Sequence, residues 1–165
     1  MTDEIRCRVE LRADDASPGR LVGVLMRYGD VGQQGRETFA PGSLSWPDNG
    51  IRIDEQHASS PARGATQPPI LRAVPFVDGD EVRIDVALPD TQRGRDLATL
   101  MRMNPPVYTG LSVEFRAVKE HRAAGRRVID SALLAGAGLT DNPSYGDTPV
   151  EVRDDEPPRR RRLWL

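Results

Sequence analysis

The sequence has little of what metal sites, disulfide frameworks and membrane spans require. Its single cysteine, Cys7, cannot form an internal disulfide and stands at no spacing typical of a metal site. We therefore expect a reducing compartment, no bound metal and no cofactor. No apolar run approaches the length of a membrane helix, and residues 1–12 lack the apolar stretch of a signal peptide. The protein is thus expected to act where it is made, without a membrane partner.

Bases that work near neutral pH are also scarce, and charge of one sign does not dominate. Only two histidines are present, His57 and His121, and the net charge is −2. Such a balance gives no reason to expect that the folded body binds nucleic acid.

What is present indicates one domain built from short strands. A chain of 165 residues can bury a core by itself, and its 14 prolines and 15 glycines argue against long helices. We expect an N-terminal strand and turn at residues 1–18, one folded domain at residues 19–153, and a disordered basic tail at residues 154–165.

Hydrophobic periodicity predicts most of the strands. Residues 5–11 alternate between apolar and polar side chains, which is typical of a half-buried strand, and residues 21–26 are apolar throughout. The second pattern fits a strand covered on both faces, although a buried helix of this length would look the same. The sequence Asp78-Gly79-Asp80 predicts a hairpin between two further strands. The remaining predicted strands lie at 51–53, 107–118, 126–139 and 150–153.

One clear helix is expected, and with the strands it indicates the fold class. The helix begins at Asp90 or Thr91, either of which can cap it, and ends near Met103 because prolines follow. Residues 39–44 predict a turn that leads into a second, short helix. The order of elements favours a mainly β fold with a few helices (α+β), arranged as a small, mainly antiparallel β-barrel.

From residue types alone, one pair of side chains is a plausible candidate for catalysis: Ser112 and His57. His57 follows a strand and precedes a polar loop, whereas His121 stands in an exposed hairpin turn. Ser112 lies on the polar face of its strand together with Glu114. An isolated histidine is more often structural or solvated than catalytic, and a serine on such a face is usually solvated. The glycine-flanked serine elbow of α/β-hydrolases is absent, which disfavours that chemistry.

Five segments, however, follow the motif order of one known family. Residues 37–44 resemble its F-x-P-G-[AS]-[LF] signature, residues 56–64 its histidine motif, an H-D-x-x-x-P-I-G-like stretch, and residues 110–115 its G-[LM]-S-x-x-F motif. Residues 19–29 resemble its opening strand, and residues 139–145 its closing L-V-x-x-P-A-[YN] stretch. Over about residues 19–152 the chain thus resembles the prohead proteases of tailed phages, which are related in fold to the herpesvirus assemblins.

The resemblance implies a function, a site and a location. Ser112 would be the nucleophile and His57 its general base, in a serine peptidase with an assemblin-like barrel. Scaffold polypeptide and major capsid protein would be the substrates, cleaved inside the immature procapsid in the cytoplasm of a bacterial host. A homodimer is left open.

One position departs from the family. Many relatives carry a glutamate that could orient the histidine, where this sequence has Gly136. Asp130, Glu114 or His121 could take that role, the last by analogy with the Ser-His-His arrangement of the herpesvirus enzymes. A dyad without a third member is the remaining option.

The tail and the competing functions stay open at this stage. The arginines Arg159, Arg160, Arg161 and Arg162 precede an apolar end, and this tail could dock on an acidic scaffold groove, contact nucleic acid weakly or only increase solubility. Instead of a protease, the chain could be a proteolytically inactive, assemblin-like part of the particle. It could also be an unrelated β-barrel binding module, in which case Ser112 and His57 would lie far apart.

Overall fold

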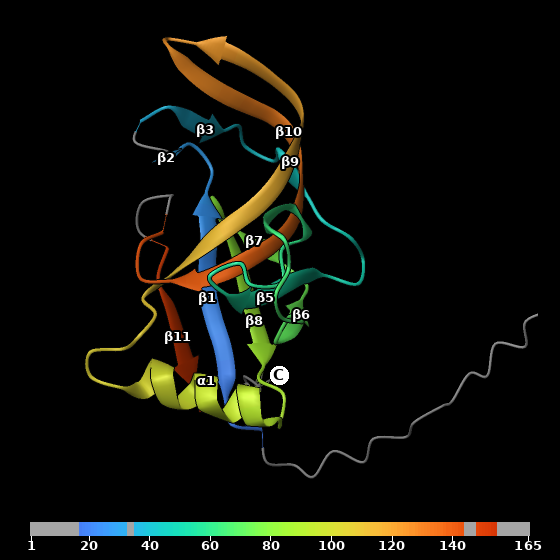
Figure 1. The fold of residues 1–165 in the computed structure, drawn as a ribbon. Coiled ribbons are helices and arrows are strands. Elements are labelled where there is room, and N and C mark those ends of the chain that lie inside the picture. Colours follow the sequence, from blue (N-terminus) through green and yellow to red (C-terminus); the bar gives the residue numbers. More distant parts are fainter. Residues whose placement is uncertain (1–16, 33–34, 144–147, 155–165) are drawn as a thin grey trace, which may run out of the picture.

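The computed structural model describes residues 17–32, 35–143 and 148–154, and this part of the chain is mainly β (Figure 1). It contains eleven strands, one α-helix and one 3₁₀ turn. In chain order these are β1 (Arg20–Arg27), β2 (Val31–Gly32), β3 (Glu37–Phe39), β4 (Leu44–Ser45), β5 (Ile51–Glu55), η1 (Pro61–Arg63), β6 (Leu71–Ala73), β7 (Phe76–Asp78), β8 (Glu81–Ala87), α1 (Gln92–Arg102), β9 (Gly110–Ala123), β10 (Arg126–Thr140) and β11 (Val150–Arg153).

The strands form two sheets. The first has the order β11-β1-β8-β7, and all its pairings are antiparallel. In the second, the long strand β10 pairs with β9 in antiparallel fashion on one side. On its other side β10 pairs in turn with β3, β4 and β5, all of them parallel to it. The second sheet is therefore mixed, whereas the sequence pattern had favoured mainly antiparallel pairing.

The apolar faces of the two sheets pack against each other. Within the second sheet, Phe39 of β3 and Phe115 of β9 meet edge to face, with 4.8 Å between ring centroids. Helix α1 covers the end of the first sheet beside β11 (Figure 1). Fully buried side chains of this core include Leu21, Leu25, Ile51, Ile53, Ile84, Leu97, Leu111, Ile129, Leu134 and Leu139. The pairings of the described strands give two sheets and no closed barrel.

Most of the predicted local elements are confirmed. Strand β1 is buried along its length, the β7–β8 hairpin turns at the expected residues, and Thr91 caps α1 by accepting a hydrogen bond from Gly94 N at 3.1 Å. The short helix expected after residues 39–44 is wrong. Leu44 instead begins strand β4, because it pairs with Ala132 of β10.

Two predicted segments lie outside the described residues: the strand at residues 5–11, and the tail from residue 155 onward with its four arginines. Among the helices that the structure does describe, none is both long and apolar enough to cross a membrane.

Candidate active site

A row of three residues crosses the second sheet on the face away from the core. Ser112 on β9 pairs directly with Gly138 on β10, which pairs in turn with Asp54 on β5. Their chain neighbours Leu111 and Leu139 are fully buried in the core. Because successive side chains of a strand point to opposite faces, Ser112 and Asp54 project from the other side.

A second row runs beside the first, two residues along each strand. It joins Glu114 on β9, Gly136 on β10 and Arg52 on β5. A Cβ on Gly136 would lie only 3.3 Å from Arg52 Nη2, and this same nitrogen donates to Glu114 Oε1 at 3.2 Å. The absent side chain at Gly136 therefore leaves room for the guanidinium to reach across β10 to the carboxylate. We call the strip above Gly136 and Gly138 the glycine trough.

His57 lies in this trough because the chain reverses directly after β5. Gln56 and His57 have φ angles of 50° and 61°, in the left-handed region that non-glycine residues rarely adopt. Ala58 N donates to Glu55 O at 3.0 Å and closes the turn. A Cβ on Gly138 would lie 2.8 Å from His57 N and 3.0 Å from its Cδ2. Only glycine at position 138 therefore lets the imidazole rest on the sheet.

This placement brings His57 beside Ser112. Directly paired residues on neighbouring strands have Cβ positions about 5 Å apart, so the ring above Gly138 is a neighbour of the Ser112 side chain. Within the part of the chain that the structure describes, His57 Nε2 is buried and has no hydrogen-bond partner. An unpaired buried nitrogen is uncommon in proteins and calls for an explanation, of which a catalytic role is one.

Glu114 faces the other nitrogen of the ring. Its Oε2 lies 3.6 Å from His57 Nδ1, within ion-pair range. Its Oε1 accepts hydrogen bonds from Ser60 Oγ at 2.7 Å and from Arg52 Nη2 at 3.2 Å. These two donors hold one carboxylate oxygen and leave the other turned toward the imidazole.

The surroundings of His57 favour its neutral form. Burial lowers the pKa of His57 below its ordinary value of 6.5, and the nearby cation of Arg63 lowers it further. The negative charges of Asp54 and Glu114 act in the opposite direction but do not reverse the shift. At neutral pH the ring can therefore accept a proton.

The lowered pKa predicts that the protein loses stability on acidification. The unfolded state, with its ordinary His57 pKa of 6.5, takes up a proton before the folded state does, so protonation favours unfolding. This contribution is complete above about pH 6.5 and is lost as the pH falls through the folded-state pKa. Denaturant unfolding across this range should show the decline, and His57→Gln should remove that part of it. If the free energy of unfolding fell equally steeply with pH in the wild type and in His57→Gln, the assignment would be contradicted.

Further buried polar contacts fix the loop that follows His57. Asp54 Oδ2 accepts hydrogen bonds from both the amide of Ser59, at 2.9 Å, and its hydroxyl. Tyr108 donates its hydroxyl to Glu55 Oε1 at 2.9 Å, and burial together with this carboxylate raises the pKa of Tyr108 to about 12. The turn that carries His57 is thus held by the Asp54–Ser59 contacts and by the Tyr108–Glu55 hydrogen bond.

Arg52, Asp54, Ser59 and Ser60 were not predicted as site residues from the sequence. One signal was available: on β5 the polar residues Arg52 and Asp54 alternate with Ile51 and Ile53. That pattern places both polar side chains on one face just before His57.

The other two candidates for a third member lie elsewhere. His121 Nδ1 and Asp130 Oδ2 are 2.7 Å apart, near the tip of the β9–β10 hairpin. His121 stands nine residues after Ser112 on the same strand, which corresponds to about 30 Å along β9. The structure therefore brings only Glu114, of the three, to His57.

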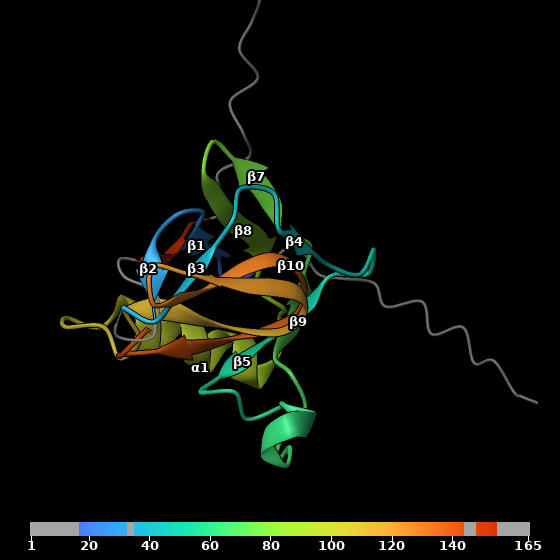
Figure 2. The same ribbon diagram turned by 90° about the horizontal axis from the view of Figure 1, so that it is seen from above.

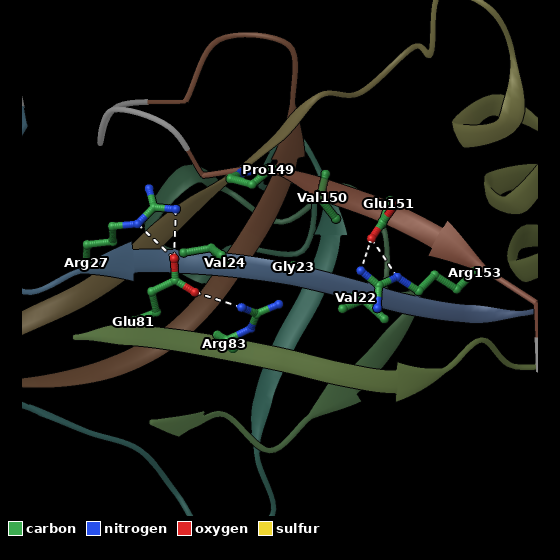
Figure 3. Close-up of a pocket in the computed structure, with 10 residues that line it drawn as sticks. All are labelled: Val22, Gly23, Val24, Arg27, Glu81, Arg83, Pro149, Val150, Glu151 and Arg153. Carbon is green, nitrogen blue, oxygen red and sulfur yellow. Dashed lines mark hydrogen bonds and ion pairs between the residues drawn. The ribbon is translucent and has the colours of Figure 1, made fainter. Parts of the chain in front are cut away.

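A separate hollow of about 360 Å³ lies on the outer face of the first sheet (Figure 3). Val22 and Val24 form part of its floor. Glu81 bonds to both Arg27 and Arg83, at 2.8 Å in each case, on one side of it. On the other side Glu151 bonds to Arg153 (Figure 3). Glu81 and Glu151 are thus both paired with arginines, so neither carboxylate of this hollow is available as a catalytic acid or base.

Comparisons with known proteins identify no family for this chain. No protein-family model matches the chain, and searches of curated proteins and of solved structures found no match. In residues 17–32, 35–143 and 148–154, no group of three or more His, Cys, Asp or Glu side chains is placed to hold a metal ion.

Proposed function

We propose that this chain is a serine endopeptidase that processes scaffold polypeptide, major capsid protein or both during prohead maturation. The order of the five motif-like segments supports membership of the prohead protease family and, with it, an assemblin-like fold. The observation that carries the chemistry is the position of His57 above Gly138, beside Ser112, with Nε2 unpaired and Glu114 at Nδ1.

The proposed reaction is acyl transfer through Ser112. Its Oγ attacks the scissile carbonyl carbon while His57 Nε2 takes the hydroxyl proton. The imidazolium then donates that proton to the leaving amine, and water hydrolyses the acyl-enzyme with His57 again acting as base. Glu114 stabilises the imidazolium at Nδ1 and sets the ring orientation, while Arg52 and Ser60 position Glu114.

Co-expression with the capsid protein tests this function. The wild-type chain should shorten the capsid protein inside the procapsids of a bacterial host, and Ser112→Ala should leave it at full length. Intact mass of the particle proteins provides the measurement and locates the cleavage site. Ser131→Ala, which changes a partly buried serine of β10, is the matched control and should cleave normally.

A full-length capsid protein with both the wild-type chain and Ser112→Ala would count against the protease. If particles still assemble around the chain in that case, it is an inactive structural component.

A further inference from the structure

The hairpin formed by β9 and β10 projects beyond the rest of the described chain, at the end opposite helix α1 (Figure 1). Strand β3 pairs with the start of β10 there, and Figure 2, which looks down on this end, shows β3 beside the hairpin. Residues 116–130, which we call the basic arm, carry five cations and two carboxylates, whereas the net charge of the whole chain is −2. Positive charge is thus concentrated on this arm.

The carboxylates of this region are already paired. Arg127 Nε donates to Glu120 Oε2 at 2.8 Å, and Arg127 Nη1 donates to Oε2 of the buried Glu37 at 2.6 Å. Asp130 Oδ2 lies 2.7 Å from His121 Nδ1. One arginine and one histidine therefore hold the negative groups and leave the other cations of the arm available.

Five cations of this region are exposed, and within the described residues none of them forms an ion pair or a side-chain hydrogen bond. They are Arg36, which precedes β3, and four residues of the arm: Arg116, Lys119, Arg122 and Arg126. Arg122 adds only a longer-range attraction to Glu120, whose pKa is lowered first by its hydrogen bond from Arg127. A cluster of cations without counter-charges in the protein attracts anions from outside it.

Two of these free guanidinium groups line one hollow. It measures about 450 Å³ and is bordered by Arg36, Glu37, Arg122, Gly125 and Arg127. Arg127 connects the other two arginines, because it pairs with Arg122 across the hairpin and its amide donates to Arg36 O at 2.8 Å. Glu37 neutralises one of the three arginines, so the hollow keeps a positive charge. A guanidinium binds a carboxylate or a phosphate through two parallel hydrogen bonds.

Two features favour a polypeptide ligand over a nucleic acid. Proteins bind single-stranded nucleic acids through cations together with aromatic side chains on which the bases stack, and residues 116–130 contain no Phe, Tyr or Trp. Duplex DNA is bound through many phosphate contacts along its length, whereas two of the free cations here converge on one hollow and the rest of the chain is net acidic. An acidic side chain on its flexible stem can enter such a hollow.

We propose that the basic arm, together with Arg36, is a docking site for an acidic polypeptide segment. One carboxylate of the segment binds Arg36 and Arg122 in the hollow, and its neighbours bind the free cations along the hairpin. Arg122 stands ten residues after Ser112, about 33 Å along β9, so this dock is separate from the proposed active site. The proposal does not rest on the protease activity.

Binding of a fluorescent peptide tests the proposal. The probe is a dodecapeptide of alternating glutamate and serine, and its Kd is measured by fluorescence anisotropy at low ionic strength, where exposed charges are least screened. Every protein carries Ser112→Ala, so that cleavage cannot consume the probe. The tail arginines would bind the same probe, so every protein also carries Arg159→Gln, Arg160→Gln, Arg161→Gln and Arg162→Gln.

Arg36→Gln/Arg122→Gln should raise the Kd about tenfold, the effect of losing two exposed ion pairs. Arg95→Gln/Arg102→Gln is the matched control, because it removes the same charge from exposed residues of α1 at the other end of the molecule (Figure 1), and it should change the Kd less than about twofold. Arg116→Gln/Lys119→Gln serves if the first variant does not fold.

Three results would overturn the proposal. The first is equal weakening by the arm variant and the α1 variant. The second is equal binding of the probe and of a peptide with glutamine in place of glutamate. The third is a single-stranded or duplex oligonucleotide that binds more tightly than the probe and loses this binding in Arg36→Gln/Arg122→Gln, which would show that the arm is a nucleic-acid site.

Discussion

Replacing His57 by alanine should lower kcat for cleavage on the order of 10⁶-fold, which is the loss seen when a catalytic histidine is removed from a serine protease. His57 is the histidine that the structure places beside Ser112, and none of the other side chains described there has an ordinary pKa close to neutrality. The assay is cleavage of a peptide that spans the site found by co-expression.

The double variant Ser112→Ala/His57→Ala tests whether the two residues act together. Groups that act as one catalytic unit give non-additive losses, so the double variant should be no slower than either single one. His121→Ala removes the other histidine at the far end of the hairpin and should leave kcat unchanged. Normal kcat in His57→Ala, or a loss in His121→Ala as large as in His57→Ala, would contradict the assignment.

Glu114→Gln should lower kcat by about 10⁴-fold, the typical effect of neutralising the carboxylate that orients a catalytic histidine. The variant keeps the shape of the side chain and its contact with Ser60, but it removes the charge 3.6 Å from His57 Nδ1. Glu114 also raises the pKa of His57, so its loss should move the acidic limb of the rate profile to lower pH.

Two matched variants separate orientation from general effects of charge. Glu120→Gln neutralises an exposed carboxylate on the same strand, away from His57, and should change neither kcat nor the pH profile. Ser60→Ala removes one of the two hydrogen bonds to Glu114 Oε1, leaves that from Arg52 and does not alter the charge, so we expect a smaller loss than in Glu114→Gln. A normal rate and an unshifted acidic limb in Glu114→Gln would instead indicate a dyad of Ser112 and His57.

The position of Glu114 also bears on the glutamate that many prohead proteases carry where this chain has Gly136. Gly136 pairs directly with Glu114, so the carboxylate that faces His57 stands on β9, directly across from position 136. The empty position is used by Arg52, which crosses Gly136 to bind Glu114.

Local pattern was sufficient for much of the fold. Strand β1, the β7–β8 hairpin, helix α1 with its Thr91 cap and the long strands β9 and β10 all follow from periodicity and turn residues, since these depend on neighbours in the chain. The helix expected after residues 39–44 failed because pairing of Leu44 with β10, a contact distant in sequence, determines the conformation there.

By itself the sequence determined the polar face that carries Ser112 and Glu114, and the strand that ends just before His57. Only the tertiary structure decided that β5 runs parallel to β10, which aligns Asp54 with Gly138 and Arg52 with Gly136. It also decided that Glu114, and neither Asp130 nor His121, faces the imidazole. The reason is physical: alternation along a strand records which face a side chain takes, whereas the neighbour across the sheet depends on register between segments distant in the chain.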